Sequence, residues 1–321
     1  MSDIRQLPLF NANPQSPKDI NRYTPFNATY DLFAEHLVKA GKSEHTVKAF
    51  VADLRLVGEA LDEELPVGEF TTSNLNRFLH WLEYERGVPC SRKSYARRVT
   101  TLKVYFKWLK GLGAIPIDPA KVVLQRSGPA PLQPVLSERE IRAAVDFSRT
   151  LKKGEVQDYR AEFVLRLLLD TGVKKSETMR LTPASFDRLN SNQPFLVIKH
   201  KARNVYKERR IDLDPDLMKL YDLYMQQYHP ERTIFNCTSR NLEYILTAIG
   251  EGAGISHKLS FEMLRWTSAV RDHRRGMEDD DLREKMGLSK VSWSETGRKI
   301  RALALQLAED SEKHRASADD Q

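Results

Sequence analysis

Residues 260–300 read SFEMLRWTSAVRDHRRGMEDDDLREKMGLSKVSWSETGRKI, and this stretch decides how the chain is organised. Its pattern predicts two helices and the start of a third, separated by polar breaks at residues 276–279 and at Gly287. Arg265 lies within the first of these helices. The beginning of the last helix offers the candidate nucleophiles Ser292, Ser294 and Thr296. The segment therefore either carries out chemistry or only holds a ligand.

The composition is that of a folded, basic protein. With 321 residues the chain is long enough for two domains, each with its own hydrophobic core. Hydrophobic residues make up 40% of the sequence, and the formal net charge is +7. This charge suits a polyanionic partner, although a soluble protein can also be basic without one.

Several other classes of protein are disfavoured. Cys90 and Cys237 have no His or Cys neighbours at metal-ligand spacing, so neither a zinc site nor a disulfide framework is expected. The acidic run at residues 278–281 suits a helix N-terminus better than a metal ion. No apolar run approaches the roughly 20 residues of a membrane span, and the first residues contain no signal core. We therefore expect a cytoplasmic protein without metal or cofactor.

Apolar periodicity and turn residues divide the chain into two expected domains. Residues 1–24 are expected to form a flexible arm, and residues 25–114 a helical domain. A linker rich in proline and glycine follows at residues 115–135. A second domain of mixed structure is expected at residues 136–309, before a polar tail at residues 310–321.

The second domain is expected to contain one β-hairpin among several helices. Its strands are predicted at residues 195–198 and 210–213, and the basic segment at 199–207 is expected to be a mobile turn. The final helix is expected to begin at Ser292 as N-cap, with Glu295 completing a capping box. The other helices are predicted at residues 163–169, 216–228, 239–249 and 260–275.

Residues 91–111, SRKSYARRVTTLKVYFKWLKG, form the most informative helix of the first domain. Its apolar stripe consists of Val99, Leu102, Tyr105, Phe106 and Leu109. The rest of the helix carries only cations, namely Arg92, Lys93, Arg97, Arg98, Lys103, Lys107 and Lys110. Because a solvated helix face usually mixes both signs of charge, this pattern predicts contact with DNA phosphates. An ordinary basic surface is the alternative.

The chain resembles the tyrosine recombinase (phage integrase, Xer-like) family over nearly all of its ordered length. Residues 39–57 and 91–123 are similar to the helical core-binding domain of that family. LLLDTGVKKSETMRL at 167–181 is similar to its first box, LVIKHKARNVYKERRIDL at 196–213 to its β-hairpin, and LSFEMLRWTSAVRDHRRG at 259–276 to its His-x-x-Arg box. The resemblance implies a mostly α fold with a small β-hairpin or sheet in the C-terminal domain. It further implies a SAM-like helical domain and a C-shaped, two-domain clamp around DNA.

The reaction of this family is a transesterification at a DNA phosphate. A tyrosine attacks while cations stabilise the charge that gathers on the phosphate oxygens. The resemblance places this tyrosine on Gly297 and two histidine positions on Glu262 and Leu288. Glycine has no nucleophile, leucine has no proton to transfer, and glutamate would put a negative charge beside the phosphate. No tyrosine follows Tyr244 in the chain. The resemblance therefore implies a degenerate member without catalysis, a probable pseudo-recombinase in which no residue is assigned as catalytic.

The cationic positions of the family are retained. The resemblance places its first arginine on Lys174, its hairpin lysine on Lys201 and its second arginine on Arg265. Together with the helix at 91–111, the predicted DNA-binding set is Arg92, Lys93, Arg97, Arg98, Lys103, Lys107, Lys174, Lys175, Lys201, Arg203, Arg265, Arg271 and Arg274. We expect a double-stranded DNA-binding protein of the nucleoid with an architectural, regulatory or mobile-element accessory role.

Two further hypotheses stay open at the level of sequence. One is a DNA strand-exchange enzyme that uses an unorthodox nucleophile. The other is a protein-interaction module that has lost DNA binding and forms a homo-oligomer through its C-terminal helix. The residues that would form this contact are Ile300, Leu303, Leu305 and Leu307, which could equally pack into the core of their own domain.

Overall fold

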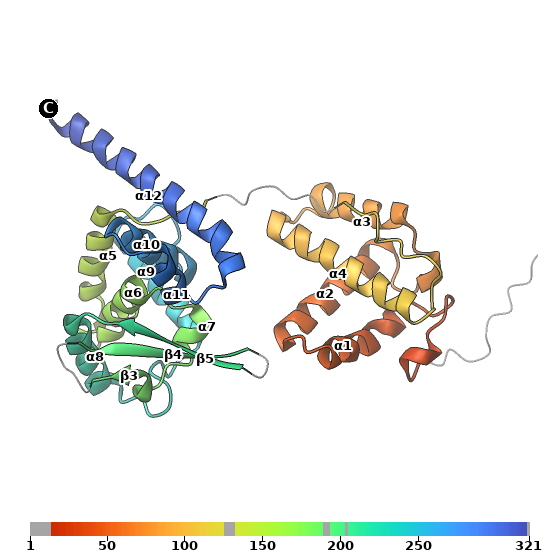
Figure 1. Cartoon of the computed structure of the whole chain (residues 1–321), viewed down its shortest axis with the longest axis horizontal. Helices are drawn as coiled ribbons and strands as arrows, with labels where there is room; N and C mark the ends of the chain where they lie inside the picture. Colours follow the sequence, from red (N-terminus) through yellow and green to blue (C-terminus); the bar gives the residue numbers. More distant parts are fainter. Residues whose placement is uncertain (1–13, 125–131, 189–192, 203–204, 320–321) are drawn as a thin grey trace, which may run out of the picture. The chain divides into compact units, whose positions relative to one another are not determined.

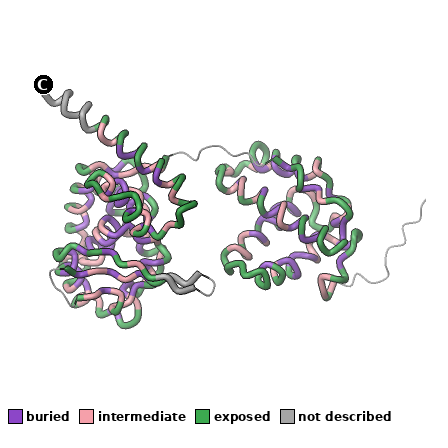
Figure 2. Tube along the Cα trace, in the orientation of Figure 1, coloured by how far each residue is buried: buried purple, intermediate pink, exposed green. Residues whose placement is uncertain are grey.

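The computed structural model describes residues 14–124, 132–188, 193–202 and 205–319 of the chain (Figure 1). The chain divides into two compact units, Met1–Ala130 and Pro131–Gln321. Buried residues gather inside each unit (Figure 2). The structure is mostly helical with small antiparallel sheets, which confirms the predicted fold class. Within the described residues, no helix combines the length and apolar character that a membrane span requires.

The first unit is built from α-helices around an aromatic core. Ser43, Thr71 and Ser91 each cap the helix that follows, because the side-chain oxygen accepts a backbone N–H three residues further on. Phe26 and Tyr105 are fully buried and meet edge to face. The α-helices are α1 (Tyr30–Lys39), α2 (Glu44–Leu61), α3 (Thr72–Tyr84) and α4 (Arg92–Gly111), and short 3₁₀ helices lie at Pro17–Asp19, Asn27–Thr29 and Val67–Glu69.

The first unit extends beyond the predicted domain at both ends. Ile20 was expected in a flexible arm, but it is buried, and the carbonyl of Thr24 accepts a hydrogen bond from Val67. Part of the predicted linker is also packed into this core, namely Ala114, Ile115, Ala120 and Val123. Apolar side chains explain both differences, because burying them outweighs the turn propensity of the neighbouring prolines and glycines. The expectation for residues 1–13 lies outside the described residues.

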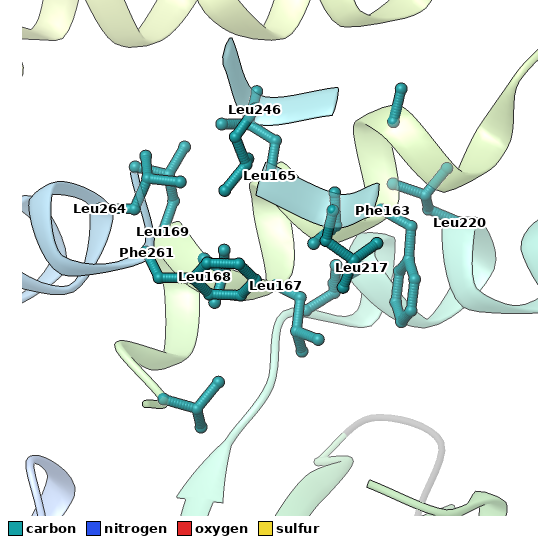
Figure 3. Packing of buried hydrophobic residues seen from close by; sticks show 14 of the residues in the cluster. Phe163, Leu165, Leu167, Leu168, Leu169, Leu217, Leu220, Leu246, Phe261 and Leu264 are labelled. Atoms are coloured by element: carbon teal, nitrogen blue, oxygen red, sulfur yellow. The ribbon is translucent and has the colours of Figure 1, made fainter. Parts of the chain in front are cut away.

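The second unit is organised around α6 (Tyr159–Thr171). This helix is buried almost all round and packs against helices on several sides, so its leucines form the centre of the core (Figure 3). The other helices are α5 (Glu138–Thr150), α7 (Lys175–Thr178), α8 (Pro215–Tyr228), α9 (Ser239–Gly252), α10 (Phe261–Arg274), α11 (Asp279–Lys285) and α12 (Lys290–Asp319), with a 3₁₀ helix at Pro183–Ser185.

The strands of the second unit form two small antiparallel sheets. The larger sheet has the order β3 (Phe186–Asp187), β4 (Phe195–Ala202) and β5 (Val205–Asp212). The predicted basic turn at 199–207 is wrong, because β4 and β5 stay paired as far as Ala202 and Val205. The residues Val205 and Tyr206 favour extended structure and explain the longer strands. The strand β3 and the two-stranded sheet of β1 (Lys152–Lys153) and β2 (Val156–Gln157) were not predicted.

Helix α12 begins earlier than the sequence suggested. Its cap is Ser289, whose hydroxyl accepts a hydrogen bond from the backbone N–H of Ser292 at 3.2 Å. The predicted cap at Ser292 is wrong because Gly287 ends α11 in a left-handed conformation, which leaves Ser289 as the first available hydroxyl. Ile300 and Leu303 are buried against α10, so most of the apolar face of α12 packs within its own unit.

The burial of α6 gives a prediction for stability. Leu168 is fully buried, so Leu168→Ala leaves a cavity and is expected to lower the free energy of unfolding by about 2–5 kcal/mol. The matched control is Leu305→Ala, because Leu305 is 67% exposed and its loss is expected to change stability by less than about 0.5 kcal/mol. Urea denaturation followed by circular dichroism measures both variants. Equal effects would contradict the central place of α6 in the core.

Candidate nucleic-acid interface

The surface of α4 carries cations that are free of acidic partners. The predicted apolar stripe of this helix is buried in the first unit. Arg92, Lys93 and Lys107 are exposed, and Lys103 is partly exposed. Among the described residues, none of these four side chains forms an ion pair or a hydrogen bond. Such cations can approach a phosphate backbone without giving up a protein contact.

Arg97 and Arg98 have a different environment from the other cations of α4. Both surround Asp53 of α2, with Arg97 Nη2 at 2.6 Å and Arg98 Nε at 3.5 Å from its Oδ1 atom. The hydroxyl of Thr101 donates to the second carboxylate oxygen at 2.9 Å. Burial raises the pKa of Asp53, although these partners oppose the shift. The two arginines therefore join α4 to α2, and their contact with DNA stays a prediction.

Removing both arginines is expected to destabilise the first unit. The double variant Arg97→Ala/Arg98→Ala leaves the carboxylate of Asp53, which is 3% exposed, without a cationic partner. We expect the free energy of unfolding to fall by about 3 kcal/mol. The control Arg92→Ala/Lys93→Ala removes two exposed cations and is expected to change stability by less than about 0.5 kcal/mol. Thermal unfolding measures both, and equal stability of the two double variants would contradict the role of Asp53.

Arg265 is partly buried, and its guanidinium is held by contacts within the second unit. Its Nη1 atom donates to the carbonyl of Gly172, just after α6, and its Nη2 atom donates to the carbonyl of Met286 at 2.5 Å. Burial lowers the pKa of Arg265 to about 10, with Arg209 adding to the shift and Glu177 opposing it. The retained arginine therefore bridges the ends of α6 and α11.

Arg209 is a residue of this site that the sequence reasoning missed. It forms two hydrogen bonds with the carboxylate of Glu177, at 2.9 and 2.7 Å, and its Nε atom donates to the carbonyl of Lys285 at 2.9 Å. Although burial acts in the opposite direction, these hydrogen bonds and the charge of Arg209 lower the pKa of Glu177. The sequence did contain a signal, because side chains two apart on a strand share a face and Ile211 is buried.

Lys174 lies beside these two arginines at the start of α7. Its backbone N–H donates to Glu177 at 2.8 Å, whereas its ammonium group forms no ion pair or hydrogen bond with the rest of the described chain. Burial lowers the pKa of Lys174, Glu177 opposes the shift, and the charges of Arg265 and Arg209 reinforce it. Lys174, Arg209 and Arg265 thus lie near the carboxylate of Glu177, which is bound to Arg209.

The remaining predicted cations are spread over several elements. Lys175 is exposed and pairs with Glu243 at 2.8 Å. Arg271 is largely buried, with its Nε atom 3.4 Å from Glu138, whereas Arg274 is exposed near the end of α10. The backbone of Lys201 lies in β4, but its side chain and the whole of Arg203 lie outside the described residues. The structure thus brings Lys174 and Arg265 together and keeps Arg271 in internal contacts.

Comparison with known proteins supports one family. The model for the phage integrase N-terminal SAM-like domain matches residues 30–112. The tyrosine recombinase XerC of Mycobacterium sp. (strain JLS) is 27% identical over 149 residues, which are 46% of this chain and 50% of that protein. XerC of Mycobacterium leprae (strain TN) is 28% identical over 160 residues, 47% of this chain and 50% of that protein. The chain thus spans about half the length of the curated relatives it matches.

Solved structures share the fold at low sequence identity. XerH site-specific recombinase bound to a palindromic difH substrate has a TM-score of 0.68 at 15% identity, covering 94% of this chain and 90% of that chain. A lambda integrase(75-356) dimer bound to a COC′ core site also has a TM-score of 0.68, at 14% identity, covering 85% and 95%. The SAM-like domain match, the XerC relatives and these shared folds support membership of the tyrosine recombinase family.

The structure also places the three positions at which the sequence departs from the family pattern. Glu262 is exposed in the first turn of α10. Leu288 and Trp293 pack against the small hydrophobic cluster that α10, α11 and α12 share. Gly297 is buried, and a Cβ atom there would lie 3.0 Å from Cε2 of Trp293. Where the resemblance places the nucleophile, this chain has a glycine in contact with an indole ring.

Proposed function

We propose that this protein binds double-stranded DNA without cleaving it. Its role would be architectural and nucleoid-associated, regulatory, or accessory to a mobile element, and its place in the cell would be the cytoplasm, at the nucleoid. The observation that carries the proposal is the set of exposed cations on α4, Arg92, Lys93 and Lys107, which have no partner within the described residues. In a tyrosine recombinase fold, such a surface is best explained by phosphate contact.

The comparison structures support DNA as the partner. Both the XerH recombinase and the lambda integrase are bound to DNA sites in those structures. Affinity for a duplex depends largely on cations that neutralise phosphates, and it needs neither a nucleophile nor a general acid. A member of this family can therefore keep DNA binding after its chemistry has been lost.

The environment of Gly297 supports the absence of cleavage. Strand transfer needs a nucleophile and proton-transfer groups around one phosphate. At the three corresponding positions this chain has Gly297, Leu288 and Glu262. The nearby hydroxyl of Ser292 accepts a hydrogen bond from Ser289 at 3.0 Å, a contact that belongs to the start of α12. Its contact with the cap residue Ser289 gives this hydroxyl a place in the structure of the helix start that requires no role as a nucleophile.

Binding to duplex DNA is expected to weaken steeply with salt. Fluorescence anisotropy with a labelled duplex should give a linear fall of log K against log salt, with a slope of about −0.9 for each phosphate neutralised. Arg92→Ala/Lys93→Ala should reduce the magnitude of the slope because two unpaired cations are lost. Lys219→Ala is the control, since Lys219 pairs with Asp216 on α8 at 2.8 Å. Absence of duplex affinity for the unaltered protein at low salt would reject the proposed function.

A covalent intermediate is not expected on DNA. Genomic fragments that the protein retains at low salt can be nicked and used as suicide substrates, which trap a cleaved strand on the enzyme. Denaturing electrophoresis should show no protein–DNA adduct. An adduct that disappears in Ser292→Ala, Ser294→Ala or Thr296→Ala would instead establish an enzyme with an unorthodox nucleophile.

A homo-oligomer through the C-terminal helix stays a weaker proposal. Ile300 and Leu303 are used within the second unit, whereas Leu305 is 67% exposed. A single exposed leucine gives little apolar area for a stable interface. An interaction module without DNA binding therefore has less support than the DNA-binding protein.

A further inference from the structure

A cavity of about 350 Å³ opens in the second unit. Among the described residues, side chains of α5, α6 and α10 supply most of its lining, which does not include Lys174, Arg209 or Arg265. Its volume lies near the lower end of the range found for small-molecule sites in proteins. The cavity therefore has room for a small ligand, and it is separate from the cations of the candidate interface.

Three of the lining side chains are aliphatic. Ile141 and Val145 lie one helical turn apart on α5, and Leu169 lines the same cavity from α6. Ile141 and Leu169 are buried, and Val145 is partly buried. An aliphatic group of a ligand would leave water on entering this part of the cavity, which favours binding.

Two charged side chains of the cavity, Asp170 and Arg271, are incompletely paired. Arg271 Nη1 lies 3.9 Å from Asp170 Oδ1, which is too far for a hydrogen bond. The Nε atom of Arg271 is buried and lies 3.4 Å from Glu138, but it forms no hydrogen bond within the described residues. The carboxylate of Asp170 accepts none in the described part of the chain either. A buried donor and a nearby acceptor thus both need a partner.

The charges around Asp170 define what such a partner must carry. Burial raises the pKa of Asp170, Arg166 and Arg271 oppose this shift, and Asp214 reinforces it. A cationic donor would stabilise the carboxylate, whereas Arg271 needs an acceptor. A simple anion would leave Asp170 without a donor, and a simple cation would leave Arg271 without an acceptor. A ligand with adjacent positive and negative groups satisfies both.

We propose that this cavity binds a free α-amino acid with an aliphatic side chain. Its ammonium group would donate to Asp170, its carboxylate would accept from Arg271, and its side chain would contact Ile141, Val145 and Leu169. These three parts match the acid, the base and the aliphatic residues of one cavity. The inference goes beyond DNA binding and does not depend on it.

L-leucine and two analogues test the proposed ligand class. Equilibrium dialysis of the full chain with radiolabelled L-leucine should show saturable binding at one site. Isocaproate lacks the ammonium group and isoamylamine lacks the carboxylate, so each should bind at least about tenfold more weakly than L-leucine. Absence of saturable L-leucine binding would overturn the inference and leave water as the partner of Asp170 and Arg271. Equal affinity of either analogue would overturn it as well.

Two variants test the place of binding. Asp170→Asn removes the charge that burial already disfavours and should raise the dissociation constant for L-leucine at least about tenfold. Val145→Phe should have a similar effect by filling the cavity. Asp146→Asn is the control, because Asp146 is an exposed residue of α5 that pairs with Arg149 at 3.4 Å. Melting temperatures identify which variants are folded, and unchanged affinity in either folded cavity variant would contradict the inference. Duplex DNA is absent from these assays, so their failure is distinguishable from failure of the proposed function.

Discussion

Buried backbone carbonyls that need donors constrain the second unit more than any other polar group. The ends of α6 and α11 meet in the second unit, and their last carbonyls need donors from outside their own helices. Arg265 and Arg209 supply the donors, at Gly172, Lys285 and Met286. Charge-assisted hydrogen bonds to carbonyl and carboxylate oxygens offset part of the cost of burying these guanidinium groups. The turn that carries Lys174, the end of β5 and the start of α12 all follow from this junction.

The same junction gives Arg209 and Arg265 a structural role that does not depend on DNA cleavage. Arg209 neutralises the buried carboxylate of Glu177 and satisfies a helix end, so losing it would destabilise the fold whether or not DNA is cleaved. Arg265 is retained for a similar reason. Leu288 packs against the hydrophobic cluster of α10, α11 and α12 and supplies no charge to the junction. The fold therefore explains why Arg209 and Arg265 are present at this site. Among the described cations of the site, the unpaired Lys174 is the one that indicates a ligand.

Much of the architecture could be predicted from the sequence because it depends on local patterns. Helical periodicity placed α4 and the buried α6. The length of β4 and β5 was not predicted, since it depends on pairing between two strands rather than on either alone. The packing of Ile20 was missed for a similar reason, because its partners lie elsewhere in the chain.

The candidate site was predictable in its residue types and much less in the role of each residue. The boxes at 167–181 and 259–276 located Lys174 and Arg265 correctly as neighbours. They could not show that Arg265 would donate hydrogen bonds to backbone carbonyls, because the sequence alone does not tell which acceptors fold next to a donor. The first unit offers a similar example. The sequence suggested that Arg97 and Arg98 are surface cations, but both pair with the buried carboxylate of Asp53 on α2 and so have a structural role.

DNA affinity and strand cleavage differ in how many residues can be replaced before the property is lost. Affinity is the sum of many separate phosphate contacts, and each lost cation weakens it by one increment. Cleavage requires a nucleophile and proton-transfer groups around a single phosphate, and removing one of them abolishes most of the rate. In the proposed function, Arg92, Lys93 and Lys107 on the surface serve the property that is distributed over many residues. The glycine at position 297, with an indole ring against it, stands at a position on which the other property would depend alone.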